Sequence, residues 1–394
     1  MPNIRRGMMA AAGAGGGATN TPFANAYYGL WGANNEAGWL GQGDSYAGVS
    51  SPVQVGDHIW KYMKSGCEQK PYLAGIKTDG TLWMWGEGGQ GQLGQGNLID
   101  YSSPVQVGSL TDWLQMGITD GASGEVALAV KTDGTLWTWG EGHEGGLGDG
   151  TTTDRSSPAQ VGSLTDWGDG EFSIENNKRL NGCYRTCGCI KTDGTLWLWG
   201  QNNEGQTGNG TNEPDKQSSP VQLGSATNWL QVDGGREYVI YLNTDGEIWG
   251  TGDNRYGMLG DGSSDNRFSP VQAGSATDWV DLAAGFWAAA AINSSGELYT
   301  WGLNDQGQLG LGDTTKRCVP VQVGSLTDWK YVSSGYEAMT AVKTDGTCWT
   351  WGNSDMRPSA TNSSSPVQVG SRTDYTWTFK PGGRGGNVGS SATI

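Results

Sequence analysis

The chain has 394 residues and a formal net charge of −16, with 24 basic against 40 acidic side chains. Binding to a nucleic-acid backbone depends on a basic surface, so this balance argues against a nucleic-acid partner. No run of about twenty apolar residues occurs, so the sequence predicts no membrane-inserted helix.

The first segment, residues 1–19, differs in kind from the rest, which we treat as one domain over residues 20–394. It opens with a short charged stretch and continues almost entirely in Ala and Gly, which is a poor signal peptide because its central part is barely hydrophobic. One interpretation is a flexible tail. The other, which we adopt, is an anchoring tail that becomes ordered inside an assembly, with partner contacts through Arg5, Arg6, Met8 and Met9.

A repeated stretch organises the remainder of the chain. Its clearest copy is Lys131 to Gly140, KTDGTLWTWG, and related copies end in seven Trp-Gly pairs: Trp31-Gly32, Trp85-Gly86, Trp139-Gly140, Trp199-Gly200, Trp249-Gly250, Trp301-Gly302 and Trp351-Gly352. A period of about fifty residues is typical of propellers and other repeat folds.

Each copy predicts a β-hairpin. Asp133-Gly134 lies between two alternating apolar runs, and an Asp-Gly turn in which both residues adopt positive φ is a strong hairpin signal. Trp137 and Trp139 share one face of the second strand while Leu136 points to the other. Both faces carry apolar groups, so we expect the sheet to be covered on both sides.

The pattern predicts an all-β fold: a seven-bladed β-propeller with four antiparallel strands per blade. The N-terminal segment, Tyr27 to Gly32, supplies only a last strand, and the C-terminal segment, Tyr375 to Lys380 with Asn387 to Ile394, supplies two first strands. We therefore expect the ring to close through a blade shared between the two ends, which removes exposed sheet edges.

The Asp-Gly, Trp-Gly and Gly-Gln-Leu-Gly motifs resemble those of the regulator-of-chromosome-condensation repeat, a seven-bladed propeller, over roughly residues 20–380. The resemblance implies the fold more strongly than the function. For this chain, the acidic charge argues against the chromatin role of the name-giving member of the family. The activity of that member as an exchange factor for a small nuclear GTPase is also unsupported, since no basic nuclear-import tail occurs beyond Arg5-Arg6. The Gly-Trp-Arg-His-Thr signature of the plant ultraviolet-B receptor, which has the same fold, is absent.

One unit is longer than the others, with its additional residues within 168–182. Insertions in repeat folds lie in loops on one rim, which is often the binding rim. Phe172, Ile174, Lys178 and Arg179 are therefore candidate partner contacts. The alternative is a tolerated loop that binds nothing.

Residues suited to catalysis or metal binding occur in patterns that the repeat explains. Cys187 and Cys189 align with Ala127 and Ala129, so we interpret them as buried free thiols rather than zinc ligands. Acid pairs such as Asp149 with Asp154 and Asp261 with Asp265 lie in Gly/Ser/Thr loops, where Asp serves turns; a calcium ion in such a loop stays an alternative. We predict no catalytic residues, no metal and no cofactor.

The leading functional hypothesis is a non-enzymatic virion structural protein of a bacteriophage, in a tail, a fibre or a capsid-associated position. The opening Arg5-Arg6-Gly7-Met8-Met9 with its Ala and Gly run resembles the starts of marine bacteriophage structural and tail-fibre proteins. The propeller would be made in the host cytoplasm and present in several copies. Residues 1–19 would bind other virion proteins, and the rim loops would contact a host surface receptor or a neighbour. The alternative is a soluble cellular regulator, cytoplasmic in location, that binds a protein partner through one propeller face.

Overall fold

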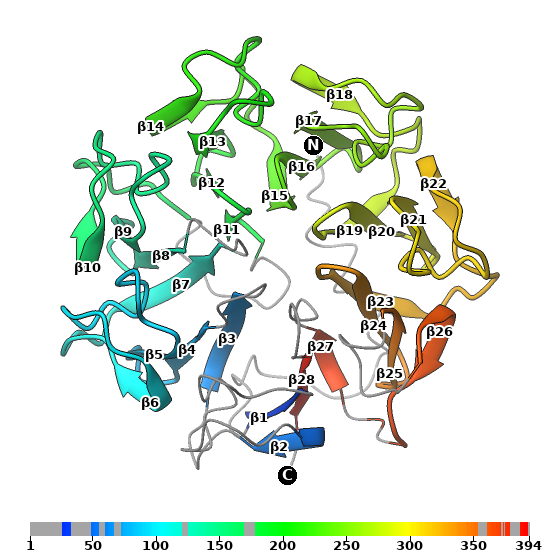
Figure 1. Ribbon diagram of the computed structural model, residues 1–394, viewed down its shortest axis with the longest axis horizontal. Helices are drawn as coiled ribbons and strands as arrows, with labels where there is room; N and C mark the ends of the chain where they lie inside the picture. The colour runs from blue at the N-terminus through cyan, green and yellow to red at the C-terminus, as the bar shows by residue number, and fades with distance from the viewer. Residues whose placement is uncertain are drawn as a thin grey trace, which may run out of the picture.

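The computed structural model describes residues 26–32, 49–54, 60–66, 72–119, 125–168, 178–353, 361–371, 373, 375–378 and 387–392. In 26–32, 49–54, 376–378 and 387–392 only the strand and its pairing are described. Every regular element in the described residues is a β-strand, and the strands are arranged around a central axis (Figure 1). The described part of the chain contains no helix suited to spanning a membrane.

Six blades each consist of four consecutive strands that pair in sequence order. Blades 1 to 3 are β3 (Trp60–Gly66), β4 (Tyr72–Lys77), β5 (Leu82–Gly86), β6 (Tyr101–Gln106); β7 (Trp113–Ile118), β8 (Val126–Lys131), β9 (Leu136–Gly140), β10 (Arg155–Gln160); and β11 (Leu180–Gly182), β12 (Thr186–Ile190), β13 (Leu196–Gln201), β14 (Lys216–Gln222). Blades 4 to 6 are β15 (Trp229–Gly234), β16 (Tyr238–Asn243), β17 (Ile248–Gly252), β18 (Arg267–Gln272); β19 (Trp279–Ala284), β20 (Ala288–Asn293), β21 (Leu298–Gly302), β22 (Arg317–Gln322); and β23 (Trp329–Ser334), β24 (Ala338–Lys343), β25 (Cys348–Gly352), β26 (Ser363–Gln368).

The expectation of a seven-bladed propeller is corrected to six blades. Only β3–β26 form blades from four consecutive strands, and the two chain ends form a different, terminal sheet in the order β2-β1-β28-β27. Its strands are β1 (Ala26–Gly32), β2 (Val49–Gln54), β27 (Tyr375–Thr378) and β28 (Asn387–Ala392). The expected pairing of the ends is present, since Tyr28 lies opposite Ser390. The N-terminal segment supplies two strands rather than one, because the Pro-Val-Gln segment is itself the outermost strand.

The outer strand of each of the six blades tolerates proline because, among the described strands, no further strand pairs with its outer edge. Pro158, in β10, illustrates this position, as do its counterparts in β6, β14, β18, β22 and β26. Proline lacks the N–H that an inner strand needs, so it is confined to edges. The second strands lie at the opposite extreme, since all six residues of β8, β16, β20 and β24 are buried. Coverage on both sides of the sheet is therefore confirmed in these blades.

In blades 2, 3, 5 and 6 the tryptophan of the Trp-Gly pair joins the blade to the preceding one. Indole Nε1 of Trp139 donates to the carbonyl of Gln92, at 2.8 Å, and Trp301 donates to Met258, at 2.7 Å. Trp199 and Trp351 make the same bond to Gly146 and Gln308. These four side chains are fully buried. The repeated Trp therefore both fills the space between blades and satisfies a loop carbonyl.

The pair Trp249-Gly250 is not equivalent to the other pairs, which corrects the repeat alignment. Gly252, with φ of 103°, matches Gly140, with φ of 104°, so Thr251 occupies the buried tryptophan position in blade 4. Its Oγ1 donates to the carbonyl of Gln206 at 3.0 Å. A hydroxyl thus replaces the indole N–H as the donor to the preceding blade.

The Asp-Gly turns differ from the expected two-residue type. In blade 2 only Gly134 has positive φ, at 76°, while Asp133 does not, and Gly134 N donates to the Lys131 carbonyl. This is the three-residue hairpin that combines a type I turn with a left-handed glycine. A Cβ on Gly134 would lie 2.1 Å from the Thr165 carbonyl oxygen, so both the turn and its packing require glycine.

The carboxylate of Asp133 fixes this turn, and its protonation is expected to loosen it. Thr135 donates to Asp133 through Oγ1 at 2.6 Å and through N at 3.0 Å, and these bonds lower the pKa of Asp133. Because the folded-state pKa is below the unfolded one, the turn's contribution is present above about pH 4 and lost as the pH falls through the folded pKa.

Replacing Thr135 with Val removes the hydroxyl donor, so we expect the pKa of Asp133 to rise toward its ordinary value. Carboxyl ¹³C chemical shifts followed from pH 7 to pH 2 measure this. Asp193, whose turn carries the same bonds from Thr195, serves as the internal control and keeps its pKa. An unchanged Asp133 titration would contradict the assignment.

Candidate functional site: a face of aromatic and arginine side chains

The loops between the first and second strands of blades 3 to 6 form a connected edge around the axis. Tyr184 N donates to the Gly235 carbonyl at 3.3 Å, Arg236 N to Phe286 at 3.1 Å, and Phe286 N to Gly335 at 3.0 Å. Each loop is therefore bonded to the loop of the next blade. Because backbone bonds rather than side chains make these links, the side chains of the loops are free to differ.

These loops carry a row of aromatic rings that crosses four blades. Phe286 lies at its centre, with ring centroids 5.7 Å from Tyr184, 4.9 Å from Trp287 and 4.4 Å from Tyr336. Tyr256, from the glycine-rich loop of blade 4, packs edge-on against Trp287 at 5.2 Å. Phe286 is buried, whereas Trp287, Tyr256 and Tyr336 are half-buried. The row therefore has an anchored centre and accessible flanks.

Three arginines lie over these rings, of which Arg185 is 5.0 Å from the centroid of Tyr184. The Arg236 guanidinium is 5.0 Å from the centroids of both Phe286 and Trp287 and 5.5 Å from Tyr184. The Arg255 guanidinium is 5.5 Å from Trp287. Cations at this distance from a ring face are attracted by its quadrupole. The face thus combines cation–π pairs with exposed aromatic area, the side-chain types that dominate binding energy at protein interfaces.

Carboxylates neutralise Arg255 far better than Arg236. Arg255 Nε lies 2.7 Å from Asp253 Oδ2, and its Nη2 lies 3.3 Å from Glu237 Oε2. Partial burial, together with the charges of Asp253 and Glu237, raises the pKa of the neighbouring Glu204. Arg236 approaches a carboxylate only at 3.9 Å, where its Nε faces Glu237 Oε1.

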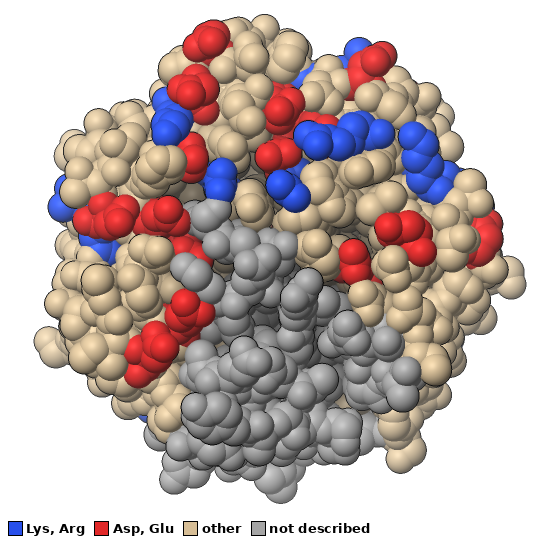
Figure 2. All heavy atoms as spheres, viewed as in Figure 1, with Lys and Arg blue, Asp and Glu red and all other residues tan. Residues whose placement is uncertain are grey.

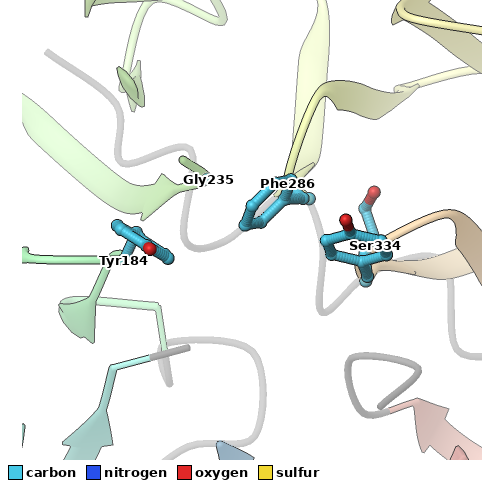
Figure 3. Close-up of a pocket in the computed structure, with 7 residues that line it drawn as sticks. Tyr184, Gly235, Phe286 and Ser334 are labelled. Atoms are coloured by element: carbon cyan, nitrogen blue, oxygen red, sulfur yellow. The ribbon is translucent and has the colours of Figure 1, made fainter. Parts of the chain in front are cut away.

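A small depression opens among the loops. Its lining residues come from blades 3 to 6: Tyr184, Gly235, Gly285, Phe286, Ser334, Gly335 and Tyr336. Its volume of about 20 Å³ holds roughly one water molecule. In Figure 3 the side chains of Tyr184, Phe286 and Ser334 follow one another along it, each from a different blade. The space is too small for an organic cofactor, so the arrangement suits surface contact.

The charges on this side of the molecule are gathered rather than spread. Figure 2 shows basic side chains between the centre and the upper rim, with acidic side chains beside them. Further toward blade 2, Glu144 lies 3.5 Å from both Arg185 and Lys216 and 3.0 Å from His143. The face is therefore locally rich in arginine although the whole chain is acidic.

A second, more open groove of about 500 Å³ lies between blades 1 and 2. Its lining includes Leu110, Trp113, Trp137 and Pro158. Counterparts of these residues recur in other blades, since Trp167, Trp197, Leu164 and Pro220 occupy the same repeat positions. The groove is thus a product of the repeat and distinguishes no single site.

The structure places two of the predicted contact residues inside the ring. Lys178 Nζ lies 2.5 Å from Asp281 Oδ1 and also donates to the Leu282 carbonyl. Arg179 is buried, and its Nη1 donates to the Lys191 carbonyl. Through these contacts both residues link distant segments of the chain. Their proposed role in partner binding stays a prediction.

The other predicted contact residues lie outside the described residues: Arg5, Arg6, Met8, Met9, Phe172 and Ile174. The interpretation of Cys187 and Cys189 as buried thiols is confirmed, since both side chains are buried. The loop acids serve turns, as expected. Asp149 accepts hydrogen bonds from Thr151 and Arg155, and Asp261 from Ser263 and Arg267.

The aromatic and arginine residues of the face were not predicted from the sequence. A signal was present, because positions just before the second strand vary while the strands repeat: Arg236-Glu237, Phe286-Trp287 and Tyr336-Glu337 occupy one repeat position. Large side chains at a variable position of a repeat mark a surface that packing does not dictate.

Comparison with known proteins identifies the repeat. The model of the regulator of chromosome condensation (RCC1) repeat matches residues 79–124, 133–169, 193–242, 245–292 and 295–342, more than half of the chain. Human HERC2, an E3 ubiquitin-protein ligase, is 27% identical over 57% of this chain and 4% of its own length. The ultraviolet-B receptor UVR8 of Arabidopsis thaliana is 30% identical over 44% of this chain and 38% of its own. The chain thus spans less than half of either relative.

Solved structures show the same fold at low identity. Yeast RCC1 (Prp20), in a crystal structure with Kap60, superposes with a TM-score of 0.74 at 16% identity, covering 98% of this chain and 96% of that chain. Human WBSCR16 superposes with a TM-score of 0.76 at 17% identity, covering 94% of this chain and 99% of that chain. A separate structure of Prp20p from Saccharomyces cerevisiae is described together with the binding properties of that protein to Gsp1p and histones.

Proposed function

Because this chain belongs to the regulator of chromosome condensation (RCC1) repeat family, we propose that it binds a protein partner through one propeller face. The observation that carries the proposal is the row of rings and arginines across blades 3 to 6. Trp287 and Tyr256 are half-buried and Arg255 is exposed, and Trp, Tyr and Arg are the residues enriched at interface hot spots.

What is known of similar proteins supports a binding role for the propeller rather than a catalytic one. Prp20, of the same fold, is described with Kap60, Gsp1p and histones. The ligase name of HERC2 belongs to a protein of which the match covers 4%, so the match gives this chain no ligase activity. The net charge of −16 favours a protein partner over nucleic acid.

Trp287→Ala is expected to weaken partner binding about 30-fold or more, because truncation of a central aromatic anchor costs roughly 2 kcal/mol or more. The full-length chain serves as bait for affinity capture from its cell of origin, followed by chemical crosslinking and titration with the purified partner. Phe268→Ala is the matched control, since Phe268 is 39% exposed in the outer strand of blade 4, away from the face. Equal loss in both variants, or crosslinks confined to other surfaces, would contradict the proposal.

A virion location is a separate prediction that rests on residues 1–19, which lie outside the described residues. The family match supports the partner-binding regulator rather than the virion component. Mass spectrometry of purified particles tests the virion location, and cell fractionation tests the cytoplasmic alternative.

A further inference from the structure

Arg236 differs from the other arginines of the face in what surrounds its charge. Arg255 has a carboxylate oxygen 2.7 Å away and Arg185 has one at 3.5 Å. Within the described part of the chain, the only ion pair of Arg236 is the 3.9 Å contact with Glu237, and Glu237 also faces Arg255 at 3.3 Å. The charge of Arg236 is therefore the least compensated of the three.

The position of the Arg236 guanidinium is fixed without hydrogen bonds from Nε. That nitrogen is buried and has no hydrogen-bond partner among the described residues. Phe286 and Trp287 lie 5.0 Å from the guanidinium, and Tyr184 lies 5.5 Å from it. The side chain as a whole is still 38% exposed. The rings hold the group at the surface, where it retains donors for a ligand.

A guanidinium held in one orientation recognises a carboxylate, because its planar fork donates two parallel hydrogen bonds to the two oxygens. Such pairs are strongest when rings exclude water beside them. The small depression next to Arg236, lined by Tyr184, Gly235 and Phe286 among others, holds only about one water molecule, so the guanidinium would meet such a carboxylate at the surface rather than inside the depression.

The backbone around Arg236 favours an Asp or Glu side chain over a chain terminus. A terminal carboxylate is usually captured by free backbone N–H groups. Here the amides of Tyr184, Arg236 and Phe286 are used in bonds to the next blade. The guanidinium of Arg236 then remains as a positively charged donor in the row of loops.

Building on the proposed function, we propose that Arg236 is the specificity-determining residue of the face and pairs with an Asp or Glu side chain of the partner. The acidic partner segment lies across blades 3 to 5, with an apolar or aromatic neighbour of the acid packed against Trp287.

A random linear peptide library displayed on cells and selected against the full-length chain tests this pairing. We expect selected peptides to share an Asp or Glu next to an apolar residue. In a synthetic selected peptide, changing that acid to its amide is expected to weaken binding about 10-fold or more, the scale of a close interfacial charge pair. With Arg236→Gln protein, the same peptide change is expected to alter affinity less than about 2-fold.

Arg317→Gln is the matched control and should leave peptide affinity unchanged, because Arg317 lies at the start of the outer strand of blade 5 and is paired with Asp313 at 2.7 Å. Arg236→Lys keeps the positive charge but removes the planar guanidinium. We expect this variant to lose most of its affinity for the peptide, because lysine cannot donate two parallel hydrogen bonds to a carboxylate. Retained affinity would show that only the charge matters. Circular dichroism and the melting temperature confirm that each variant is folded.

The outcomes distinguish this inference from the proposed function. One outcome is that peptides bind the face and lose affinity with Trp287→Ala, but their affinity changes neither with the acid nor with Arg236→Gln. This would overturn the carboxylate pairing and leave the proposed partner binding intact. Selected peptides that end in an essential free carboxylate would overturn the choice of a side chain. Absence of any peptide or partner contact with the face would overturn the proposed function itself.

Discussion

Truncation of the chain after Lys380 is expected to destabilise the propeller by about 5 kcal/mol or more, an amount comparable to the whole stability of many domains. The deletion removes β28, which pairs with β1 on one side and β27 on the other. Both neighbours would be left with unpaired edges, and the terminal sheet would lose its link between the chain ends.

Chemical denaturation of the truncated and full-length chains measures the effect, with limited proteolysis as a second readout. Deletion of residues 1–19 is the matched control, because no strand of the described structure begins before Ala26. We expect that deletion to leave the melting temperature unchanged. A truncated chain with the melting temperature of the full-length protein would show that the terminal sheet does not hold the ring together.

Trp301→Ala is expected to lower the free energy of unfolding by about 3–5 kcal/mol, the usual cost of removing a large buried aromatic side chain. Trp301 is fully buried in the core shared by blades 4 and 5. Its Nε1 also donates to the Met258 carbonyl in the preceding blade at 2.7 Å, so the substitution leaves a cavity and an unsatisfied carbonyl together.

Trp301→Phe separates these two contributions. It keeps most of the apolar volume but removes the donor, so we expect a smaller loss of about 1–3 kcal/mol. Urea denaturation of both variants gives the comparison. Equal destabilisation by Phe and Ala would show that the hydrogen bond, rather than the filled space, carries the link between blades.

Sequence reasoning found the features that repeat. The Asp-Gly turns, the buried tryptophans and the pairing of the chain ends depend on local chemistry and on period, both of which are visible in one dimension. It failed where one repeat departs from the others. Trp249-Gly250 reads as a regular pair, yet the structure places Thr251 in the buried position and Trp249 two residues out of phase.

The candidate face was harder to predict, because it is assembled from loops that lie about fifty residues apart in the chain. Nothing local to Arg236 indicates that Phe286 and Trp287 lie 5.0 Å from its guanidinium. In the same way, the charge of Lys178 suggested a solvent-exposed contact, whereas the fold pairs it with Asp281 of another blade.

By itself the sequence determined the all-β repeat, the hairpin turns, the buried thiols and the acidic character of the chain, because each follows from residue types at short and regular separations. Only the tertiary structure decided the count of six complete blades, the use of the Pro-Val-Gln segment as an outer strand, and the meeting of arginine with aromatic rings. Those depend on which strands pair and which loops converge around the axis, and contacts between distant segments are set by packing in three dimensions.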